Sequence, residues 1–507
     1  MTDFGKTIAA AYEFEGEALE LGRGVHDGEL EKEAVVRIPL ATSNRHGLIA
    51  GATGTGKTRT LQLLAEQLSA AGVAVVGADM KGDLSGIAQP GEPGGPAEKR
   101  AAELGQDWKP TGFPTEFFSI GGIGPGIPIR ATVSDFGPLL LAKILEANET
   151  QEQSLSLVFR YADGKGLPIL DLADLRALLT FFDSDEGKAE LKGIGGVSSA
   201  TIGVLLRSLV QLEDGGGTEF FGEPQLDIAD LLRTAPDGRG IISCLELPAV
   251  QDKPKLFSTV LMWLLAELFE QLPEAGDLPK PKLVFFFDEA HLLFADATDA
   301  FLDSVVQTVR LIRSKGVGIF FITQTPKDLP ADVLAQLGNR IQHALRAFTP
   351  QDAKALKATV STFPTTELYE LEELLTSLGT GEAAVTILSE KGVPTPVVHT
   401  RLRGPLARME PADDVEGSAK ASPLYAKYGT KVDRESAREL LAARIEQQAP
   451  EAEPEPEPQE APAPRRRRRA EPVAAGDPLT DFLGSRQGKT LQREVVRGMF
   501  GLLRKRL

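Results

Sequence analysis

The sequence is very poor in cysteine. Cys244 is the single cysteine among 507 residues, which excludes an intrachain disulfide framework and a cysteine-based zinc cluster. The five histidines are scattered and do not have the spacing of metal ligands. This composition is typical of a reducing compartment, so we expect a cytoplasmic protein.

A long hydrophobic run is also missing. The longest apolar segment, Phe257–Phe269, is short and is interrupted by Glu267. A transmembrane helix needs about 20 apolar residues to cross a hydrocarbon core of about 30 Å. Residues 1–20 are acidic and lack the apolar stretch of a signal peptide. We therefore expect no membrane partner.

Positive charge is scarce over most of the chain. The formal net charge is −17, from 55 Lys and Arg against 72 Asp and Glu. Residues 465–507 contain 12 basic and 4 acidic residues, a net charge of +8, which leaves −25 for residues 1–464. Such an acidic body excludes a general coat for nucleic acid, although a local positive channel inside it remains compatible with DNA binding.

The order of the predicted strands and helices is typical of an α/β protein with a mostly parallel sheet. A glycine-rich loop joins a strand at 46–50 to a helix at 58–71, and a strand at 73–78 completes a βαβ unit. Further strands are predicted at 240–247, 282–287, 317–323 and 340–348, with helices at 97–104, 254–271, 297–314 and 331–337.

These patterns divide the chain into seven predicted segments. They are a short β-rich N-terminal cap (1–40), a first part of the core (41–137), an α-helical insertion (138–233), a second part of the core (234–405), a helical extension (406–448), a disordered Pro/Glu/Arg linker (449–480) and a C-terminal amphipathic basic helix (481–507). We expect long loops across 83–128, and we expect the ordered core to end at Arg403.

The strongest motif is Gly51-Ala-Thr-Gly-Thr-Gly-Lys-Thr58, which matches G-x-x-x-x-G-K-[ST] between a strand and a helix. The glycines let backbone N–H groups surround a phosphate, and the helix adds its positive N-terminus. Lys57 would reach the β- and γ-phosphates, and the Thr58 hydroxyl would bind Mg²⁺. The predicted nucleotide-binding residues are Gly51, Ala52, Thr53, Gly54, Thr55, Gly56, Lys57, Thr58 and Arg59.

An acidic pair closes the apolar strand at 282–287. Asp288 would hold the magnesium through water, and Glu289 would polarise the attacking water as general base. Asp288 lies unusually far from Lys57 along the chain, a separation that the helical insertion explains.

Other polar residues fit a nucleotide-driven motor. Gln324 ends the strand at 317–323, where it could sense the γ-phosphate. Asp79, at the end of the strand at 73–78, is either the cap of a turn or a catalytic residue. An arginine finger stabilises charge in the transition state of phosphoryl transfer, and four arginines are open candidates for it. They are Arg310, Arg313, Arg340 and Arg346.

We expect ATP and Mg²⁺ as cofactors. The N-K-x-D signature that reads guanine is absent, which favours ATP over GTP. Residues 288–291 spell Asp-Glu-Ala-His, as in DEAH-box helicases, but the paired-arginine motif Q-x-x-G-R-x-G-R of those helicases is missing.

Several motifs together resemble the YjgR-type branch of the HerA-like ATPases, within the HerA/FtsK superfamily of P-loop motors. They are Asn44–Thr58, Asp79–Leu84, Asp288–His291, Val309–Val317, Thr323–Gln324 and Leu337–Arg346, with Leu491–Leu503 near the C-terminus. The resemblance implies a RecA-like P-loop NTPase core with Walker A and Walker B motifs, a glutamine at the end of the fourth strand, and often a hexameric ring.

Two functions remain open at this stage. The resemblance and the basic tail favour a ring-forming DNA translocase or helicase-like motor, which we prefer. The acidic body favours a nucleotide-driven switch that acts on protein partners. The switch also agrees with the roughly 40 residues that precede the first core strand, too few for the complete N-terminal β-barrel of HerA.

The C-terminal tail has two features of its own. Arg465–Arg469 would bind nucleic acid or an acidic partner, or would remain a solvated charge run. The helix at 490–507 has an apolar face that could lie on a membrane surface, and we expect it instead to dock on its own or a neighbouring subunit.

The motifs make a direct prediction about turnover. Lys57→Ala should abolish ATP hydrolysis because the phosphates lose their cation, and Glu289→Gln should bind ATP without hydrolysing it because the base is gone. Phosphate release and nucleotide binding measure the two effects. Robust hydrolysis by either variant would contradict the assigned roles.

Overall fold

A twelve-stranded sheet runs through the protein in a computed structural model that describes residues 2–276, 278–294 and 299–448. The described residues up to Gln448 form one compact unit. The predicted linker (449–480) and basic helix (481–507) therefore lie outside the described residues.

Eight adjacent strands of the sheet are parallel. In spatial order they are β10 (Asn339–Gln342), β3 (Gly47–Ala50), β9 (Val317–Thr323), β8 (Leu283–Phe287), β4 (Ala74–Asp79), β7 (Ile242–Glu246), β5 (Thr115–Ile120) and β6 (Ile127–Ile129). Every residue of β3, β9, β8 and β4 is buried, as expected for strands covered on both faces. The predicted RecA-like core with a mostly parallel sheet is confirmed.

The other four strands are antiparallel and extend the sheet beyond β10. They are β11 (Glu382–Thr386), β12 (Val398–Leu402), β1 (Ala18–His26) and β2 (Glu29–Pro39). Residues 18–39 thus belong to the main sheet. The prediction of short strands is wrong for Asp3–Ala11, which form helix α1. Phe4, Ile8 and Tyr12 recur every four residues and are buried, so this segment has helical periodicity.

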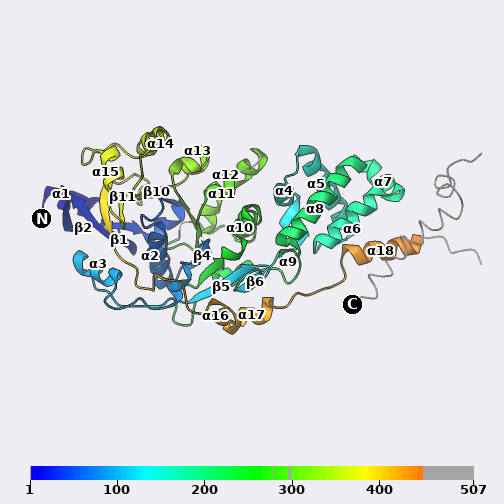
Figure 1. Ribbon diagram of the computed structural model, residues 1–507, viewed down its shortest axis with the longest axis horizontal. Helices are drawn as coiled ribbons and strands as arrows, with labels where there is room; N and C mark the ends of the chain where they lie inside the picture. The colour runs from blue at the N-terminus through cyan, green and yellow to red at the C-terminus, as the bar shows by residue number, and fades with distance from the viewer. Residues whose placement is uncertain (1, 277, 295–298, 449–507) are drawn as a thin grey trace, which may run out of the picture. The chain divides into compact units, whose positions relative to one another are not determined.

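Helices pack around the central strands (Figure 1). The helices of this part of the chain are α2 (Lys57–Ala70), α3 (Pro96–Leu104), α10 (Pro254–Gln271), α11 (His291–Phe294), α12 (Asp299–Ile312), α13 (Ala331–Leu334), α14 (Pro350–Val360) and α15 (Leu371–Ser377). Helix α2 contacts β1, β3 and β4, and thereby holds the loop that precedes it. None of the described helices is long and apolar enough to span a bilayer.

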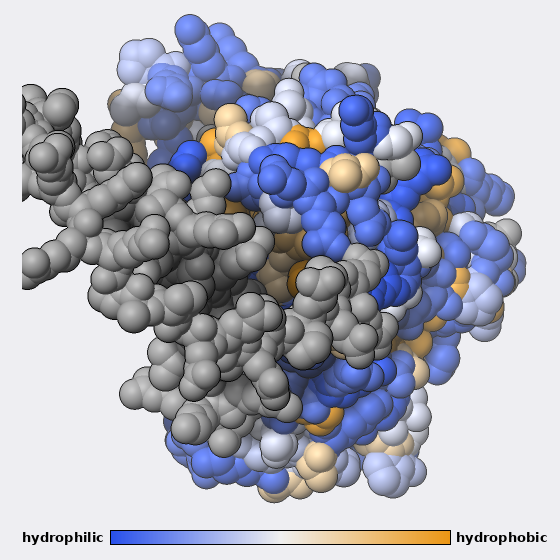
Figure 2. Space-filling model, turned by 90° about the vertical axis from the view of Figure 1, so that its right-hand side faces the viewer, coloured by the Kyte–Doolittle hydropathy of each residue, from blue (hydrophilic) through white to orange (hydrophobic). Residues whose placement is uncertain are grey.

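A group of helices lies between β6 and β7 in the sequence and gathers at one end of the unit formed by the described residues (Figure 1). It contains α4 (Val133–Ile144), α5 (Glu149–Lys165), α6 (Leu172–Asp183), α7 (Asp185–Leu191), α8 (Ser199–Leu212) and α9 (Thr218–Phe220). Capping boxes at Asn148 and Asp171 begin α5 and α6. The surface visible from this end is mainly hydrophilic, with scattered apolar residues (Figure 2).

The chain continues in order past Arg403, where the sequence predicted that the ordered core ends and that a helical extension (406–448) follows. The chain forms α16 (Val415–Ala421), α17 (Pro423–Tyr428) and α18 (Ala437–Gln448). The buried carboxylate of Glu66 on α2 accepts hydrogen bonds from the backbone N–H groups of Leu406 (2.8 Å) and Ala407 (2.9 Å). The extension is therefore fastened directly to the helix that follows the phosphate loop.

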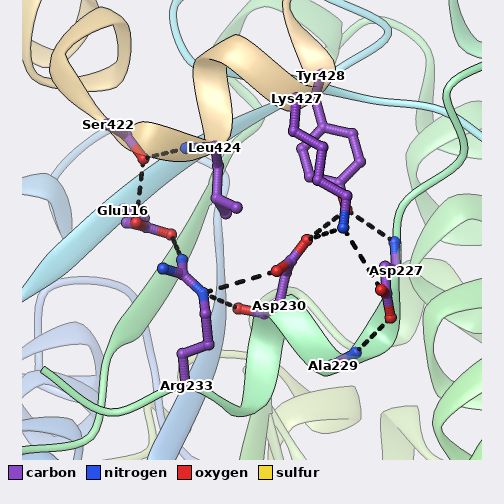
Figure 3. Close-up of polar contacts among 9 residues, drawn as sticks. All are labelled: Glu116, Asp227, Ala229, Asp230, Arg233, Ser422, Leu424, Lys427 and Tyr428. Atoms are coloured by element: carbon purple, nitrogen blue, oxygen red, sulfur yellow. Dashed lines mark hydrogen bonds and ion pairs between the residues drawn. The ribbon is translucent and has the colours of Figure 1, made fainter.

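A polar network holds α17 to the body (Figure 3). The Ser422 hydroxyl donates to Glu116 at 3.0 Å, and the Lys427 ammonium lies 2.8 Å from Asp230. The buried Tyr428 hydroxyl also donates to Asp230. These contacts join residues that lie far apart in the sequence, which explains why local patterns did not predict them.

Tyr12 allows a test of how firmly α1 is attached. Its buried hydroxyl donates to the Pro396 carbonyl (2.8 Å) and accepts from the Thr395 hydroxyl (2.8 Å). Tyr12→Phe leaves both groups without this partner, so the free energy of unfolding should fall by about 1–3 kcal/mol. Urea denaturation measures the change.

Tyr425→Phe is the matched control, because the structure shows no hydrogen bond from the Tyr425 hydroxyl to any described residue. This variant should change the stability by less than about 0.5 kcal/mol. Equal effects of the two substitutions would show that the Tyr12 hydroxyl does not anchor α1.

Candidate active site

The glycine-rich loop connects β3 to α2, and its backbone requires glycine. The φ angles are 153° at Gly51, 80° at Gly54 and 118° at Gly56, all in a region that disfavours other residues. A Cβ atom at Gly51 would also lie 2.5 Å from the Cβ of His343. Space is open at Gly54, where a Cβ would meet no described atom within 4 Å. The loop is thus an open backbone cradle at a helix N-terminus.

Lys57 folds back onto this cradle. Its Nζ donates to the carbonyl oxygens of Gly51 (2.7 Å) and Ala52 (3.3 Å). Burial lowers the pKa of Lys57, and the nearby Glu289 and Asp288 carboxylates oppose that shift. The ammonium thus has neutral carbonyl oxygens as its partners. A negatively charged phosphate at the same place would form a stronger hydrogen bond with it.

The two residues beside Lys57 occupy different environments. Thr58 is half-buried in the first turn of α2. Arg59 turns away from the cradle, donating to the Gln62 side chain (2.9 Å) and to the Asp83 carbonyl (3.3 Å). Thr58 is thus placed to provide a metal ligand, whereas Arg59 already has partners in the protein.

Asp288 and Glu289 follow β8, which is separated from β3 by β9 alone. Burial, with the negative charge of Glu289, raises the pKa of Asp288 to about 7. Asp288 Oδ1 accepts a hydrogen bond from the Glu289 backbone N–H at 2.9 Å. A carboxyl group with this pKa is easily ionised when a divalent cation binds.

Glu289 has an unusual backbone. Its φ angle is 48°, a left-handed conformation that costs a residue with a side chain about 1–3 kcal/mol and often marks a functional site. Among the described residues, its Oε2 is buried without a hydrogen-bond partner, and His291 Nδ1 lies 3.5 Å away. The carboxylate therefore keeps an oxygen available to accept a proton.

Gln324 contacts the glycine-rich loop through its backbone and not through its side chain. Its carbonyl oxygen accepts the Gly51 N–H at 3.1 Å, whereas its side chain is exposed. A displacement of the end of β9 would therefore move Gly51, the first residue of the cradle, through this hydrogen bond.

The four candidate arginines occupy different places. Arg346 lies at the loop, where its Nη2 donates to the Thr53 carbonyl at 3.3 Å. Arg340 points elsewhere, with its guanidinium bonded to the carbonyls of Thr362, Leu334 and Leu337. Arg310 and Arg313 are exposed near the start of β9, the sheet edge opposite the loop. Of the four, Arg346 is the one that contacts the loop in the part of the chain that the structure describes.

Sequence reasoning missed His343, which packs beneath the cradle. Its ring bonds to the Thr60 hydroxyl (2.9 Å) and to the Glu382 carbonyl (2.9 Å), and burial lowers its pKa to about 4. It is thus a neutral support for the loop. Its position at the end of a strand was the available signal, but the neighbouring strands were not known from the sequence.

Asp79 caps a turn, as in one of the two interpretations left open by the sequence. Its carboxylate accepts hydrogen bonds from four backbone N–H groups, belonging to Lys81, Gly82, Leu84 and Ser85. The turn brings Lys81, a residue that the sequence did not single out, to 3.7 Å from Glu289.

The site fits a nucleoside triphosphate with Mg²⁺. The open cradle and Lys57 match the phosphates, and Thr58 and Asp288 are oxygen ligands of the kind that Mg²⁺ prefers. The unbonded oxygen of Glu289 has no described partner that would prevent it from accepting a proton.

A family model described as Helicase HerA-like C-terminal matches residues 25–506. The chain belongs to this family. The predicted membership among the HerA-like ATPases is confirmed. No curated protein sequence matches this HerA-like chain significantly.

Solved structures share the fold of the HerA-like chain. The bacterial conjugative coupling protein TrwBΔN70 is 13% identical, with a TM-score of 0.52 over 81% of this chain and 94% of its own. VirB4 of Thermoanaerobacter pseudethanolicus is 16% identical, with a TM-score of 0.50 over 76% and 97%. TrwB in complex with the ATP analogue ADPNP is 16% identical, with a TM-score of 0.51 over 81% and 94%.

The raised pKa of Asp288 predicts a pH-dependent stability. The folded-state pKa of about 7 exceeds the ordinary 3.8, so the folded state binds more protons between these values and the free energy of unfolding falls as the pH rises. The free energy of unfolding of Asp288→Asn should therefore exceed that of the parent by about 1–3 kcal/mol near pH 8, and the two should be nearly equal near pH 4. Urea denaturation at both pH values measures this difference.

Asp252→Asn, at an exposed aspartate outside the site, is the control and should follow the parent at every pH. If the stability of Asp288→Asn changes with pH as that of the parent does, ionisation of the Asp288 carboxyl does not destabilise the folded protein as expected.

Proposed function

We propose that this HerA-like protein is an Mg²⁺-dependent ATPase that converts ATP to ADP and inorganic phosphate. The observation that carries the proposal is the meeting of Lys57 and Glu289, from motifs far apart in the sequence, at one edge of the sheet. The left-handed backbone of Glu289 supports the proposal, because such a conformation costs free energy and is found most often at functional sites.

The chain's residues divide the reaction among them. The loop N–H groups and Lys57 bind the phosphates, and Thr58 and Asp288 would hold Mg²⁺, which adds positive charge when bound. Glu289 orients a water molecule and accepts its proton as the water oxygen bonds to the terminal phosphorus. The bond from that phosphorus to the bridging oxygen then breaks, and ADP leaves.

The nucleotide state would be transmitted through β9. The Gln324 carbonyl bonds to Gly51, so a shift of the loop on binding phosphate moves the end of this strand. The exposed Gln324 side chain is the candidate sensor of the terminal phosphate. Arg346 is the candidate for a cation acting within the same subunit.

The proposed mechanical role is that of a homo-oligomeric DNA translocase or helicase-like motor, in a ring that would be hexameric. Support comes from the family, whose description is helicase, and from the TrwB fold relatives, described as plasmid coupling proteins and observed with ADP and Mg²⁺. In a ring, the exposed Arg310 and Arg313 would be available to a neighbouring subunit's site. Arg340 is less suited, because carbonyl groups already bind its guanidinium.

The acidic charge of residues 1–464, −25, favours a second candidate function. In it, ATP binding and hydrolysis switch the protein between conformations that bind protein partners, without translocation along DNA. An acidic surface repels a polyanion and suits basic protein partners.

Steady-state ATP hydrolysis with and without single- and double-stranded DNA separates the two functions. For a motor, we expect DNA to stimulate hydrolysis several-fold or more, and added salt to weaken the stimulation because phosphate contacts release counterions. Glu289→Gln is the blank, and Glu274→Gln, at an exposed glutamate, is the matched control that should hydrolyse normally.

Hydrolysis that is indifferent to DNA at low salt would overturn the motor and leave the switch. The absence of hydrolysis in the parent protein, with or without DNA, would instead overturn the ATPase itself.

A further inference from the structure

A short loop after β4, residues Met80–Leu84, borders the site and is rigidly built. The Asp79 carboxylate, itself 2% exposed, accepts N–H groups of the loop at 2.7 Å from Gly82 and 2.8 Å from Leu84. The Ser85 hydroxyl adds a bond to the Gly82 carbonyl at 2.7 Å. These hydrogen bonds restrain the backbone on both sides of Lys81.

The same loop is fastened to the phosphate cradle. Arg59, the residue after Thr58, donates to the Asp83 carbonyl at 3.3 Å, and its guanidinium lies 3.9 Å from the Asp83 carboxylate. The loop thus has one attachment at the end of β4 and another at the first turn of α2. Its position is set by the elements that form the nucleotide site.

Lys81 extends from this fixed backbone toward Glu289. Its Nζ lies 3.7 Å from Glu289 Oε1, an ion pair without a hydrogen bond. The Lys81 side chain is 53% exposed, whereas that of Glu289 is 17% exposed. The positive charge of Lys81 also acts on the other ionisable groups that face it: it opposes the burial that raises the pKa of Asp288, and it adds to the burial that lowers the pKa of Lys57.

The physical chemistry of this pair favours exchange. An ion pair that is open to solvent on the lysine side and has no hydrogen bond contributes little free energy, and four rotatable bonds let the ammonium move while its backbone stays in place. A terminal phosphate has a charge of about −1.5 to −2, against −1 for a carboxylate, so it is the stronger partner of a lysine within reach.

We propose that Lys81 is a cis-acting cation of the site, which pairs with Glu289 in the nucleotide-free protein and contacts the terminal phosphate of bound ATP. The inference rests on the proposed ATPase function. ADP lacks the terminal phosphate and leaves the pair with Glu289 intact. ATP draws Lys81 away, so the Glu289 carboxylate becomes free to bind water when a hydrolysable phosphate is present.

Calorimetric titration of the full-length protein tests the proposal with two ligands, a non-hydrolysable ATP analogue and ADP, both with Mg²⁺. Lys81→Met should weaken binding of the analogue about 10- to 100-fold, the effect of losing a charge-assisted hydrogen bond, and change ADP binding less than about twofold. Lys81→Arg should restore much of the preference for the triphosphate.

Lys420→Met is the matched control, since Lys420 is 56% exposed and paired with Glu416 on α16. It should bind both ligands as the parent does. A second measurement uses Glu289→Gln, which should strengthen analogue binding more in the parent than in the Lys81→Met background, because only the parent has an ion pair to release.

The outcomes are distinguishable. Equal loss of analogue and ADP binding in Lys81→Met would assign Lys81 a role in building the loop and overturn the proposal. Unchanged analogue binding would overturn it as well. If the parent binds neither ligand, the ATPase function itself fails.

Discussion

The parallel pairing of β3, β9, β8 and β4 is the constraint on which the site depends. Ala50 pairs with Thr323, Phe287 with Phe321, and Gly77 with Phe286. Because neighbouring parallel strands point the same way, the residues that follow them leave the sheet at one edge. The phosphate cradle, Gln324, the acidic pair and the Lys81 loop are therefore neighbours, although they are spread over more than half of the sequence.

The energetic cost of the site is concentrated at this edge. Asp288 has a raised pKa, Glu289 has a left-handed backbone, and Lys57 is held by neutral carbonyls. Burial of the Asp288 carboxyl, the left-handed backbone of Glu289 and burial of the Lys57 charge each cost the folded protein free energy. The strands beneath are buried along their whole length, and this apolar sheet supplies the stability that tolerates them.

The additions to the core leave this arrangement intact. The helices between β6 and β7 leave the sheet after one parallel strand and return to another, so the chain adds a whole group of helices without disturbing the pairing. The extension after Arg403 instead braces the core, since the buried Glu66 side chain holds Leu406 and Ala407 against α2. Contacts from Tyr428 and Lys427 to Asp230 fasten the same extension farther along (Figure 3).

The sequence by itself determined the P-loop core and its two principal motifs. Helix 254–271 and strand 317–323 were predicted with the bounds that the structure has, because burial of one face or of a whole strand leaves a local periodic pattern. The tertiary structure alone decided the antiparallel extension by residues 18–39, the attachment of Leu406 and Ala407 to Glu66, the placing of Arg346 but not Arg340 at the loop, and the approach of Lys81 to Glu289. These features are pairings between residues far apart in the chain, and no local pattern specifies which distant partner a strand edge or a charged side chain will meet.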